Sequence, residues 1–589
     1  MKNNFKYFSY FYRYLRYRLF VTFFISLFVG LLDGIGLALF IPLLKLVANN
    51  ATGETAQEDP ISKFVLGYLG LTPDLTHILA LILLFFSLKG IAKFLEGYVR
   101  VKYQQYFMRK VRLTNIDLLN TYDFKHFVKA DVGRIQNTFT GEVSRVNTAL
   151  RYYFKAFQYG VLVLVYVVMA FIADPLFSLM VVTGGILTNF LFSTLYKRTK
   201  FFSRKLTAKN HIFQDLLIQK VAFFKYLKTT GLNFIFGNKL KKNIHKLEGL
   251  QLRIGLIDSL LAALREPVIV SIIVVAIYLQ IAFFNEDVGL VILSLLLLYR
   301  ALTFFMGMQE QWNFFLGVSG SLENMENFSR ELEAGKESNG TEIIKGFREK
   351  LEFKNVFFRY DGKDVLKNIN LEIYKNETVA IVGESGSGKS TLMSMISGLL
   401  QPTEGSYQID HNSISSLDLS SWKSHIGYVS QDVNIFNDSI LNNVTFWADK
   451  NSENHQKFQN AIERAAIDDF ISELPEKEET LLGNNGINLS GGQKQRLSIA
   501  RELYKQVDLL LMDEATSALD GETEAIIQQN IDKLKGQLTI IVIAHRLATI
   551  KKADKIIVLK KGEIKAIGTY KELLQKSTDF KEMTELQNL

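Results

Sequence analysis

The sequence predicts two fold classes in one chain, an all-α domain of six membrane-crossing helices followed by an α/β domain. The 589 residues are too many for one hydrophobic core. Leu, Phe, Ile and Val crowd the part before about Phe328, and 48% of all residues are hydrophobic. Beyond that point, strand and helix patterns alternate as in a soluble α/β protein. We predict the helical domain over residues 1–325, a linker over 326–345 and the α/β domain over 346–589.

The helical domain contains six apolar runs that are long enough to cross a bilayer, since a transmembrane helix needs about 20 residues. Asp174-Pro175 separates the third run from the fourth and predicts a tight turn, because proline cannot extend the incoming helix. The predicted spans are Leu19–Val47, His77–Val101, Tyr153–Ala173, Leu176–Leu195, Ile254–Phe284 and Val288–Phe315.

The first apolar run is interpreted as a retained membrane helix. It continues to about Leu44, too far for a signal-peptide core, and no small-residue cleavage site accompanies it. Acidic residues gather after the first and fifth runs, whereas Lys and Arg gather after the second and fourth. The positive-inside rule then predicts a multi-pass protein of the inner membrane with both termini in the cytoplasm.

The two basic segments between the spans are long and nearly free of Pro and Gly. Structureless loops of that length are uncommon in compact domains. We predict that the membrane helices continue into the cytoplasm and end in short connectors near Thr121–Val128 and Phe223–Thr230. The alternative is that these segments form separate soluble subdomains.

Charge and cysteine content narrow the function classes. The net charge of +9 is interpreted as the basic cytoplasmic face of a membrane protein, because no Lys/Arg-aromatic motif for nucleic acid stands out. The chain has no cysteine, which excludes disulfides, thiolate chemistry and cysteine-based metal sites.

A glycine-rich loop follows the buried strand predicted at Val379–Val382. It reads Gly383-Glu384-Ser385-Gly386-Ser387-Gly388-Lys389-Ser390, and a helix follows from Thr391. This is a P-loop in the strand–loop–helix context that the motif requires. Glycines let the backbone N–H groups face a phosphate, and the helix N-terminus adds a positive dipole. We expect Lys389 to contact the β- and γ-phosphates of ATP and Ser390 to ligate Mg²⁺.

A second buried strand, Leu509–Met512, ends in two acids. Because it is a core strand, we predict that its end lies beside the P-loop. Asp513 would hold Mg²⁺ through its water shell, and Glu514 would orient or deprotonate the attacking water.

Over about Leu351–Leu574 the chain resembles the ATPase domain of ABC transporters. The segment Leu489-Ser490-Gly491-Gly492-Gln493 matches the signature sequence of that family without a change, about twenty residues before Asp513. With six predicted helices in front, the whole chain resembles a type IV exporter half-transporter. The resemblance implies ATP hydrolysis coupled to transport, with ATP and Mg²⁺ as cofactors.

The resemblance also implies roles for further residues. Tyr360 is similar to the aromatic residue that stacks on adenine, and Gln431 to the glutamine that senses Mg²⁺ and contacts the membrane domain. His545 is similar to the switch histidine that contacts the γ-phosphate. The loop Ser517–Asp520 is similar to the one that crosses between protomers.

A single P-loop leaves the γ-phosphate partly uncovered. Ser490 and the glycines after it open a helix whose N-terminus can bind that phosphate from the opposite protomer. One P-loop and one signature, each complete, predict a homodimer with two composite ATP sites. The segment Gly483–Asn488 departs from the family pattern, because exporters often carry charged residues there.

The substrate is predicted from cations within apolar spans, where each costs about 2.5–3.5 kcal/mol on insertion scales. Lys89, Arg265 and Arg300 could line an inward-facing cavity for a phosphate-bearing substrate. The alternative is internal pairing, of Arg265 with Glu266 or of Lys89 with Asp33.

The apolar stretch Ile61–Leu71 could lie on the outer membrane surface as an amphipathic helix. Together with the three cations it resembles bacterial lipid-linked oligosaccharide flippases of the ABC class. The expected function is therefore a flippase for a lipid-linked oligosaccharide or another anionic lipid. The alternatives are an exporter of drugs, peptides or lipid A, and an ATP-gated channel or non-transporting regulator.

Overall fold

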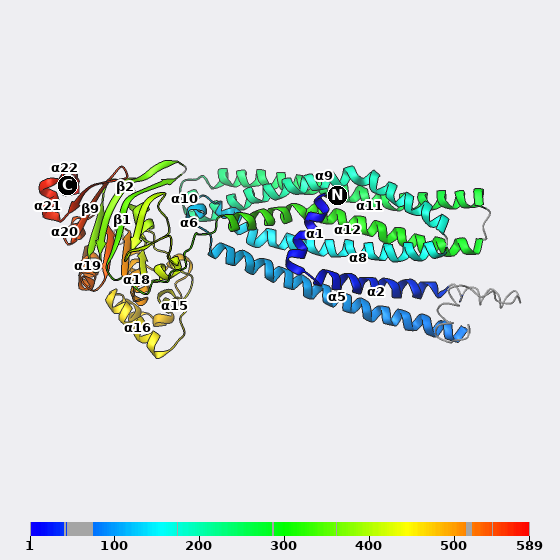
Figure 1. The fold of residues 1–589 in the computed structure, drawn as a ribbon, viewed down its shortest axis with the longest axis horizontal. Coiled ribbons are helices and arrows are strands. Elements are labelled where there is room, and N and C mark those ends of the chain that lie inside the picture. Colours follow the sequence, from blue (N-terminus) through cyan, green and yellow to red (C-terminus); the bar gives the residue numbers. More distant parts are fainter. Residues whose placement is uncertain are drawn as a thin grey trace. The chain divides into compact units, whose positions relative to one another are not determined.

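The computed structural model describes residues 2–40, 43, 75–173, 175–284, 288–360, 362–513, 521–544 and 546–587 (Figure 1). They fall into two compact units, which are treated separately below. Unit 1 comprises Met1–Tyr122 and Lys129–Lys336, and unit 2 comprises Asp123–Val128 and Glu337–Leu589.

Unit 1 is all helical and its long helices run side by side (Figure 1). Four segments of the described helices are long and apolar enough to cross a membrane: Arg18–Leu37, Leu75–Asn120, Val132–Phe171 and Asn233–Leu279. The other two predicted spans begin the helices α9 and α12, which run for 48 and 47 residues. The helices are α1 (Lys2–Leu15), α2 (Arg18–Ala38), α5 (Leu75–Asn120), α7 (Val132–Asn137), α8 (Val143–Ala173), α9 (Pro175–Ala222), α10 (Phe224–Thr229), α11 (Asn233–Phe284) and α12 (Val288–Ala334), with a π-helical turn at Thr138–Glu142.

The long helices of unit 1 run on beyond the predicted spans and are followed by short connectors. Helix α5 runs unbroken for 46 residues, and the four-residue helix α6 (Phe124–Phe127) follows it. Asp123 starts α6 by accepting a hydrogen bond from the Lys125 backbone N–H. In the second segment α10 separates α9 from α11. In the described structure these segments are continuous helices. The expected outer helix Ile61–Leu71 lies outside the described residues.

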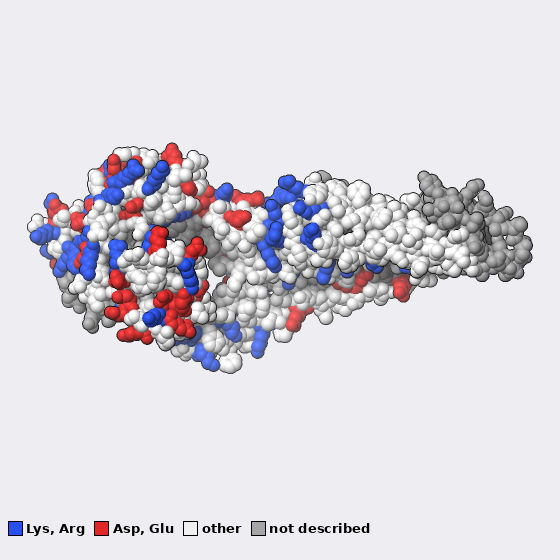
Figure 2. Space-filling view, turned by 90° about the horizontal axis from the view of Figure 1, so that it is seen from below, with Lys and Arg blue, Asp and Glu red and all other residues white. Residues whose placement is uncertain are grey.

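Aromatic packing holds the helices of unit 1 together near the N-terminus. Phe11 of α1, Phe107 of α5 and Phe315 of α12 are fully buried in one cluster. Phe11 and Phe107 meet edge to face with ring centroids 5.7 Å apart, a geometry that aromatic quadrupoles favour. On the face shown in Figure 2, charged side chains are sparse over a long part of the helical unit, as expected for a surface that faces lipid.

Unit 2 contains two sheets. A four-stranded antiparallel sheet has the order β2-β1-β4-β5, and a six-stranded sheet has the order β10-β9-β3-β8-β7-β6. Strand β3 pairs in parallel with β8 and β9, and all five of its residues are buried. Its unbroken apolar sequence follows from this double-sided burial. The strands are β1 (Lys350–Tyr360), β2 (Lys363–Tyr374), β3 (Thr378–Val382), β4 (Glu404–Ile409), β5 (Asn412–Ser413), β6 (Ile426–Val429), β7 (Leu509–Asp513), β8 (Thr539–Ile543), β9 (Lys555–Lys560) and β10 (Glu563–Gly568).

Unit 2 also contains helices, of which α13 follows the P-loop and α18 follows the signature segment. They are α13 (Lys389–Ile396), α14 (Leu419–Ser424), α15 (Ile440–Thr445), α16 (Ser452–Arg464), α17 (Asp468–Glu473), α18 (Gly491–Tyr504), α19 (Gly521–Leu534), α20 (Leu547–Lys551), α21 (Tyr570–Lys576) and α22 (Thr578–Gln587). Phe124 of α6 packs against the apolar core of this unit, which places the first connector within unit 2.

Candidate nucleotide site and the charges of the membrane helices

The glycine-rich loop runs from the end of β3 into α13, in the strand–loop–helix order that the sequence predicted. A Cβ at Gly383 would lie 2.1 Å from the backbone oxygen of Leu559, so no larger residue fits there. Gly388 caps α13 with φ 105°, a left-handed conformation that other residues rarely adopt. These two glycines let the backbone fold back as a cradle.

Lys389 lies inside this cradle and is only 7% exposed. Its ammonium donates to the backbone oxygens of Gly383 at 2.8 Å and of Glu384 at 3.0 Å. Nearby, the Ser387 hydroxyl is buried and has no hydrogen-bond partner among the described residues. A buried cation beside an orphaned hydroxyl and a tight backbone cradle fits a bound phosphate, and Ser390 and Thr391 lie at the start of the same helix.

Asp513 lies at the carboxyl edge of the same sheet, but not directly beside the P-loop strand. Strand β8 stands between β3 and β7, with Ile543 aligned with both Ile381 and Asp513. The prediction that the end of this strand lies beside the P-loop concerned the acid and not the strand order, and it stays a prediction. The edge gathers the ends of the five parallel strands β9, β3, β8, β7 and β6, and β6 continues the register with Val429 opposite Met512. Gln431 follows β6 by two residues and is exposed at this edge.

Carboxylate, amide and hydroxyl oxygens are the ligands that Mg²⁺ prefers. Ser390, Gln431 and Asp513 supply one of each at this edge. Glu514, the loop Ser517–Asp520 and His545 lie outside the described residues. Tyr360 ends β1 half-buried and meets Phe358 edge to face at 4.8 Å between ring centroids.

The signature segment is a helix cap. The Ser490 hydroxyl accepts from the Gln493 backbone N–H at 3.2 Å, and the Gln493 side chain accepts from the Ser490 N–H at 2.8 Å. This reciprocal capping box starts α18 and leaves Ser490 and Gly491 exposed. The N-terminus of a 14-residue helix thus faces outward from this unit, where it can receive an anion.

Two residues that the sequence analysis missed organise this region. Arg501 of α18 is buried, and its guanidinium donates to Asn443 O at 2.7 Å, Asn443 Oδ1 at 3.0 Å and Asn434 O at 2.9 Å. It therefore ties the segment after Gln431 to the signature helix. Burial lowers the pKa of Arg501 from its ordinary value. The signal for this in the sequence is a basic residue eight positions after the end of the signature segment.

Tyr428 of β6 is the second residue. The strand register places its side chain on the same face of the sheet as Asp513. Burial raises the pKa of Tyr428 to about 12, and the charge of Asp513 adds to the shift. The hydroxyl consequently stays protonated at neutral pH and can donate to that carboxylate.

The cations of the membrane helices behave differently from one another. Lys89 of α5 forms an ion pair with Asp33 of α2, and its ammonium lies 5.0 Å from the centre of the Phe86 ring. Internal pairing, one of the two alternatives, is thus observed for Lys89. Arg300 of α12 is exposed and has no ion-pair partner among the residues that the structure describes. Arg265 lies on α11, and its side chain is outside the described part.

Comparisons with known proteins agree with this organisation. Residues 366–517 match the family model described as "ABC transporter". The chain is 29% identical over 504 residues to the heterocyst differentiation ATP-binding protein HepA of Nostoc sp., covering 85% of this chain and 83% of that protein. It is 42% identical over 248 residues to the ATP-dependent lipid A-core flippase of Pasteurella multocida, covering 42% of each chain.

A solved structure has the same fold. It is described as a bacterial Atm1-family ABC exporter with ATP bound, and it matches with a TM-score of 0.81 at 23% identity over 98% of this chain and 99% of that chain. The chain spans less than half the length of the lipid A-core flippases that it matches.

Proposed function

We propose that this chain, an ABC transporter of the exporter type with an ATPase domain fused to its membrane domain, translocates an anionic lipid across the inner membrane. A lipid-linked oligosaccharide is the first candidate, and a lipid A-type molecule is the second because relatives bear the name lipid A-core flippase. Drug or peptide export is the third. The observation that carries the proposal is the exposed Arg300 on α12, within the sixth predicted span.

Placing the Arg300 cation within a predicted membrane span costs free energy. An arginine at the centre of a span costs about 2.5–3.5 kcal/mol on insertion scales unless it is hydrated or paired. A phosphate or diphosphate group provides the pairing, because guanidinium binds phosphate oxygens in bidentate geometry. We place Arg265 in the same role. Lys89 contributes less, since Asp33 already neutralises it.

In the ATPase unit we assign Lys389 and the loop Gly383–Ser390 to the phosphates of ATP and Tyr360 to adenine. Ser390, Gln431 and Asp513 would hold Mg²⁺, which when bound neutralises charge developing on the transferred phosphoryl group. Glu514 would orient the attacking water and His545 would contact the γ-phosphate. Tyr428 keeps the Asp513 carboxylate oriented through its protonated hydroxyl.

The signature helix completes the site from a second copy of the chain. Ser490 and Gly491 are exposed at the start of α18, so they can meet the γ-phosphate held by the P-loop of the partner. The complex is then a homodimer with two ATP sites, and both termini of each chain are cytoplasmic.

The test uses vesicles that contain the purified homodimer and a labelled lipid-linked glycan, with parallel vesicles that contain labelled lipid A. Arg300→Gln should lower ATP-dependent flipping at least tenfold and leave basal hydrolysis within about twofold of wild type, because the charge contacts only the lipid. Lys241→Gln, an exposed cation on α11 outside the predicted span, is the matched control. Equal flipping by Arg300→Gln and wild type with both lipids would remove the anionic-lipid proposal.

A further inference from the structure

The hairpin turn between β9 and β10 lies against the P-loop. Lys561 and Gly562 form this two-residue turn with φ of 51° and 84°, left-handed values that tight hairpin turns require. The Gly562 N–H donates to the Ser387 carbonyl oxygen at 3.0 Å. At the start of the loop, a Cβ at Gly383 would collide with the backbone oxygen of Leu559, the residue before the last of β9. The end of β9 and its turn therefore contact the P-loop at two places.

The hydrogen bond from Gly562 fixes the direction of one peptide unit of the P-loop. In a trans peptide the C=O and the N–H point in opposite directions. Because the Ser387 carbonyl points to the turn, the Gly388 N–H of the same peptide points away from it. Backbone N–H groups that point to one side form the concave site that binds a phosphate. A displaced turn would thus change the donors that the loop presents.

An ion pair joins the same turn to helix α22. Lys560, the last residue of β9, donates from its ammonium to the Asp579 carboxylate at 2.5 Å, with side chains 35% and 31% exposed. Asp579 lies in the first turn of α22, and the next residue, Phe580, is buried in the core of unit 2. The Phe580 ring meets that of Tyr570 in α21 edge to face, with centroids 5.7 Å apart. The ion pair thus ties the turn to a helix that apolar packing anchors.

The charges around Lys560 belong to both of these neighbours. The hydrogen bond to Asp579 and the charge of that carboxylate raise the pKa of Lys560. The charges of Glu384 in the P-loop and of Glu582 in α22 add to the shift. Lys560 therefore interacts electrostatically with the P-loop as well as with α22.

We propose that the turn Lys560–Gly562 positions the P-loop for ATP and that the Lys560–Asp579 ion pair makes α22 part of this support. The inference rests on the proposed role of the P-loop as the loop that binds ATP. Lys560, Gly562 and Asp579 are positioning residues, because they act through the backbone of the loop. A half-exposed ion pair is weak and is screened by salt, so its loss changes ATP binding modestly and only at low ionic strength.

The first test measures KM for ATP and kcat of hydrolysis by the full-length chain in neutral detergent. Lys560→Met and Asp579→Asn should each raise KM about threefold and leave kcat within about twofold of wild type, because the pair affects binding. The double variant should equal either single variant, since the two residues act as one unit. In about 1 M KCl the KM values of variants and wild type should converge, which a purely structural defect would not produce.

The second test displaces the turn itself. Gly562→Ala places a Cβ 2.4 Å from the Val365 carbonyl oxygen at a left-handed backbone position. It should weaken binding of a fluorescent ATP analogue by at least about tenfold at any salt concentration, because the strain does not depend on charge. The melting temperature reports whether this variant is folded. If it does not fold, the two ion-pair variants still decide the proposal.

Matched controls separate the ion pair from general effects of charge. Lys561→Met, an exposed cation of the same turn, and Glu585→Gln, an exposed acid of α22, should keep the wild-type KM. Opposite shifts of KM in Lys560→Met and Asp579→Asn would show that Lys560 acts on the nucleotide through its charge, and this would overturn the proposal. Unchanged KM in both variants would overturn it as well.

Lys389→Ala distinguishes this inference from the proposed role of the loop. If the loop does not bind ATP, Lys389→Ala hydrolyses ATP as wild type does. If only the support by the turn and α22 is wrong, Lys389→Ala loses hydrolysis while the ion-pair variants keep the wild-type KM.

Discussion

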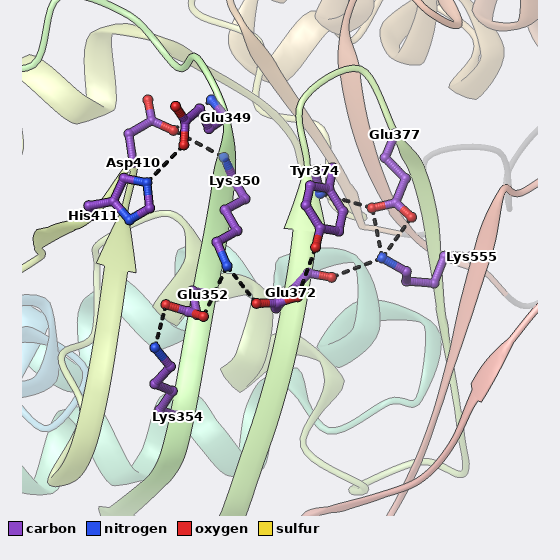
Figure 3. A network of polar contacts seen from close by, with 10 residues as sticks. All are labelled: Glu349, Lys350, Glu352, Lys354, Glu372, Tyr374, Glu377, Asp410, His411 and Lys555. Carbon is purple, nitrogen blue, oxygen red and sulfur yellow. Dashed lines mark hydrogen bonds and ion pairs between the residues drawn. The ribbon is translucent and has the colours of Figure 1, made fainter.

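The ATPase unit and the membrane unit use the same charged residue types in opposite surroundings. On the antiparallel sheet of unit 2, Lys350 reaches Glu352 at 3.0 Å and Glu372 at 2.6 Å in a network that meets water through Glu372, which is 42% exposed (Figure 3). In unit 1, Asp33 and Lys89 pair between two membrane helices with side chains 12% and 24% exposed. Lys350 and Glu352 are themselves 21% and 11% exposed, so the two pairs differ in their neighbours rather than in their own exposure. The comparison teaches that surroundings, rather than contact distance, set the free energy of an ion pair.

A buried carboxyl group of unit 1 is held by neutral hydrogen-bond donors instead of a cation. Glu96 of α5 is 3% exposed and accepts hydrogen bonds from Ser26 of α2 and, at 2.7 Å, from Gln158 of α8. One carboxyl group thus joins three helices. Lys389 and Arg501 are buried cations of unit 2, so the effect of burial on stability can be measured there without the membrane helices.

The largest expected effect is on catalysis. Lys389→Ala should lower steady-state ATP hydrolysis at least 100-fold, because the charge that meets the phosphates is lost. Its partners in the free protein are two backbone oxygens, so the melting temperature should change little. Phosphate release and thermal unfolding of the purified chain measure the two effects. Hydrolysis near the wild-type rate would show that Lys389 is a structural cation like Arg501.

The next effect tests burial within unit 2. Arg501→Ala should lower the free energy of unfolding of unit 2 by about 3 kcal/mol, because two buried oxygen acceptors of Asn443 and the partly buried backbone oxygen of Asn434 lose their donor. Lys571→Ala, an exposed cation on α21, should change it by less than about 0.5 kcal/mol. Denaturant unfolding in micelles, followed by tryptophan fluorescence, gives both values. Similar losses in the two variants would contradict the role of burial.

The membrane pair should show an intermediate effect. Asp33→Asn leaves the Lys89 charge without its counter-ion and should destabilise unit 1 by about 2 kcal/mol. The double variant Asp33→Leu, Lys89→Met should recover most of this loss, since no charge is then left in the span. Thermal unfolding of the single and double variants in one detergent completes the cycle. Strictly additive losses would mean that the two charges do not interact.

The smallest effect is expected on the network of Figure 3, in which Glu372 is 42% exposed. Hydrogen bonds from Lys354 and Lys350 lower the pKa of Glu352 from 4.5 to about 2. Since the folded-state pKa is the lower one, this group stabilises the fold above about pH 4.5 and loses that contribution as the pH falls toward 2. Lys350→Met should therefore narrow the difference in melting temperature between pH 7 and pH 4, by no more than about 2 °C. A larger change in melting temperature would show that this network contributes as much to stability as the buried charges do.

Local sequence determined the parts of this protein that depend on neighbouring residues. The buried run Val379–Val382 with its glycines fixed the P-loop, and the Ser490–Gln493 spacing fixed the capped signature helix. Apolar length likewise fixed the long helices, and the absence of Pro and Gly predicted their extension to short connectors. Each signal lies within about twenty residues, so no knowledge of packing is needed.

Only the tertiary structure decided which distant groups meet. It inserted β8 between β3 and β7, joined Arg501 to Asn443 and chose Asp33 as the partner of Lys89 from 56 positions away. It also brought Asp258 and Asn313 to one cavity wall. The physical reason is that strand order and the facing of helices minimise the free energy of the whole core. Hydropathy and spacing describe each helix or strand by itself, and they are the same for several ways of packing them together.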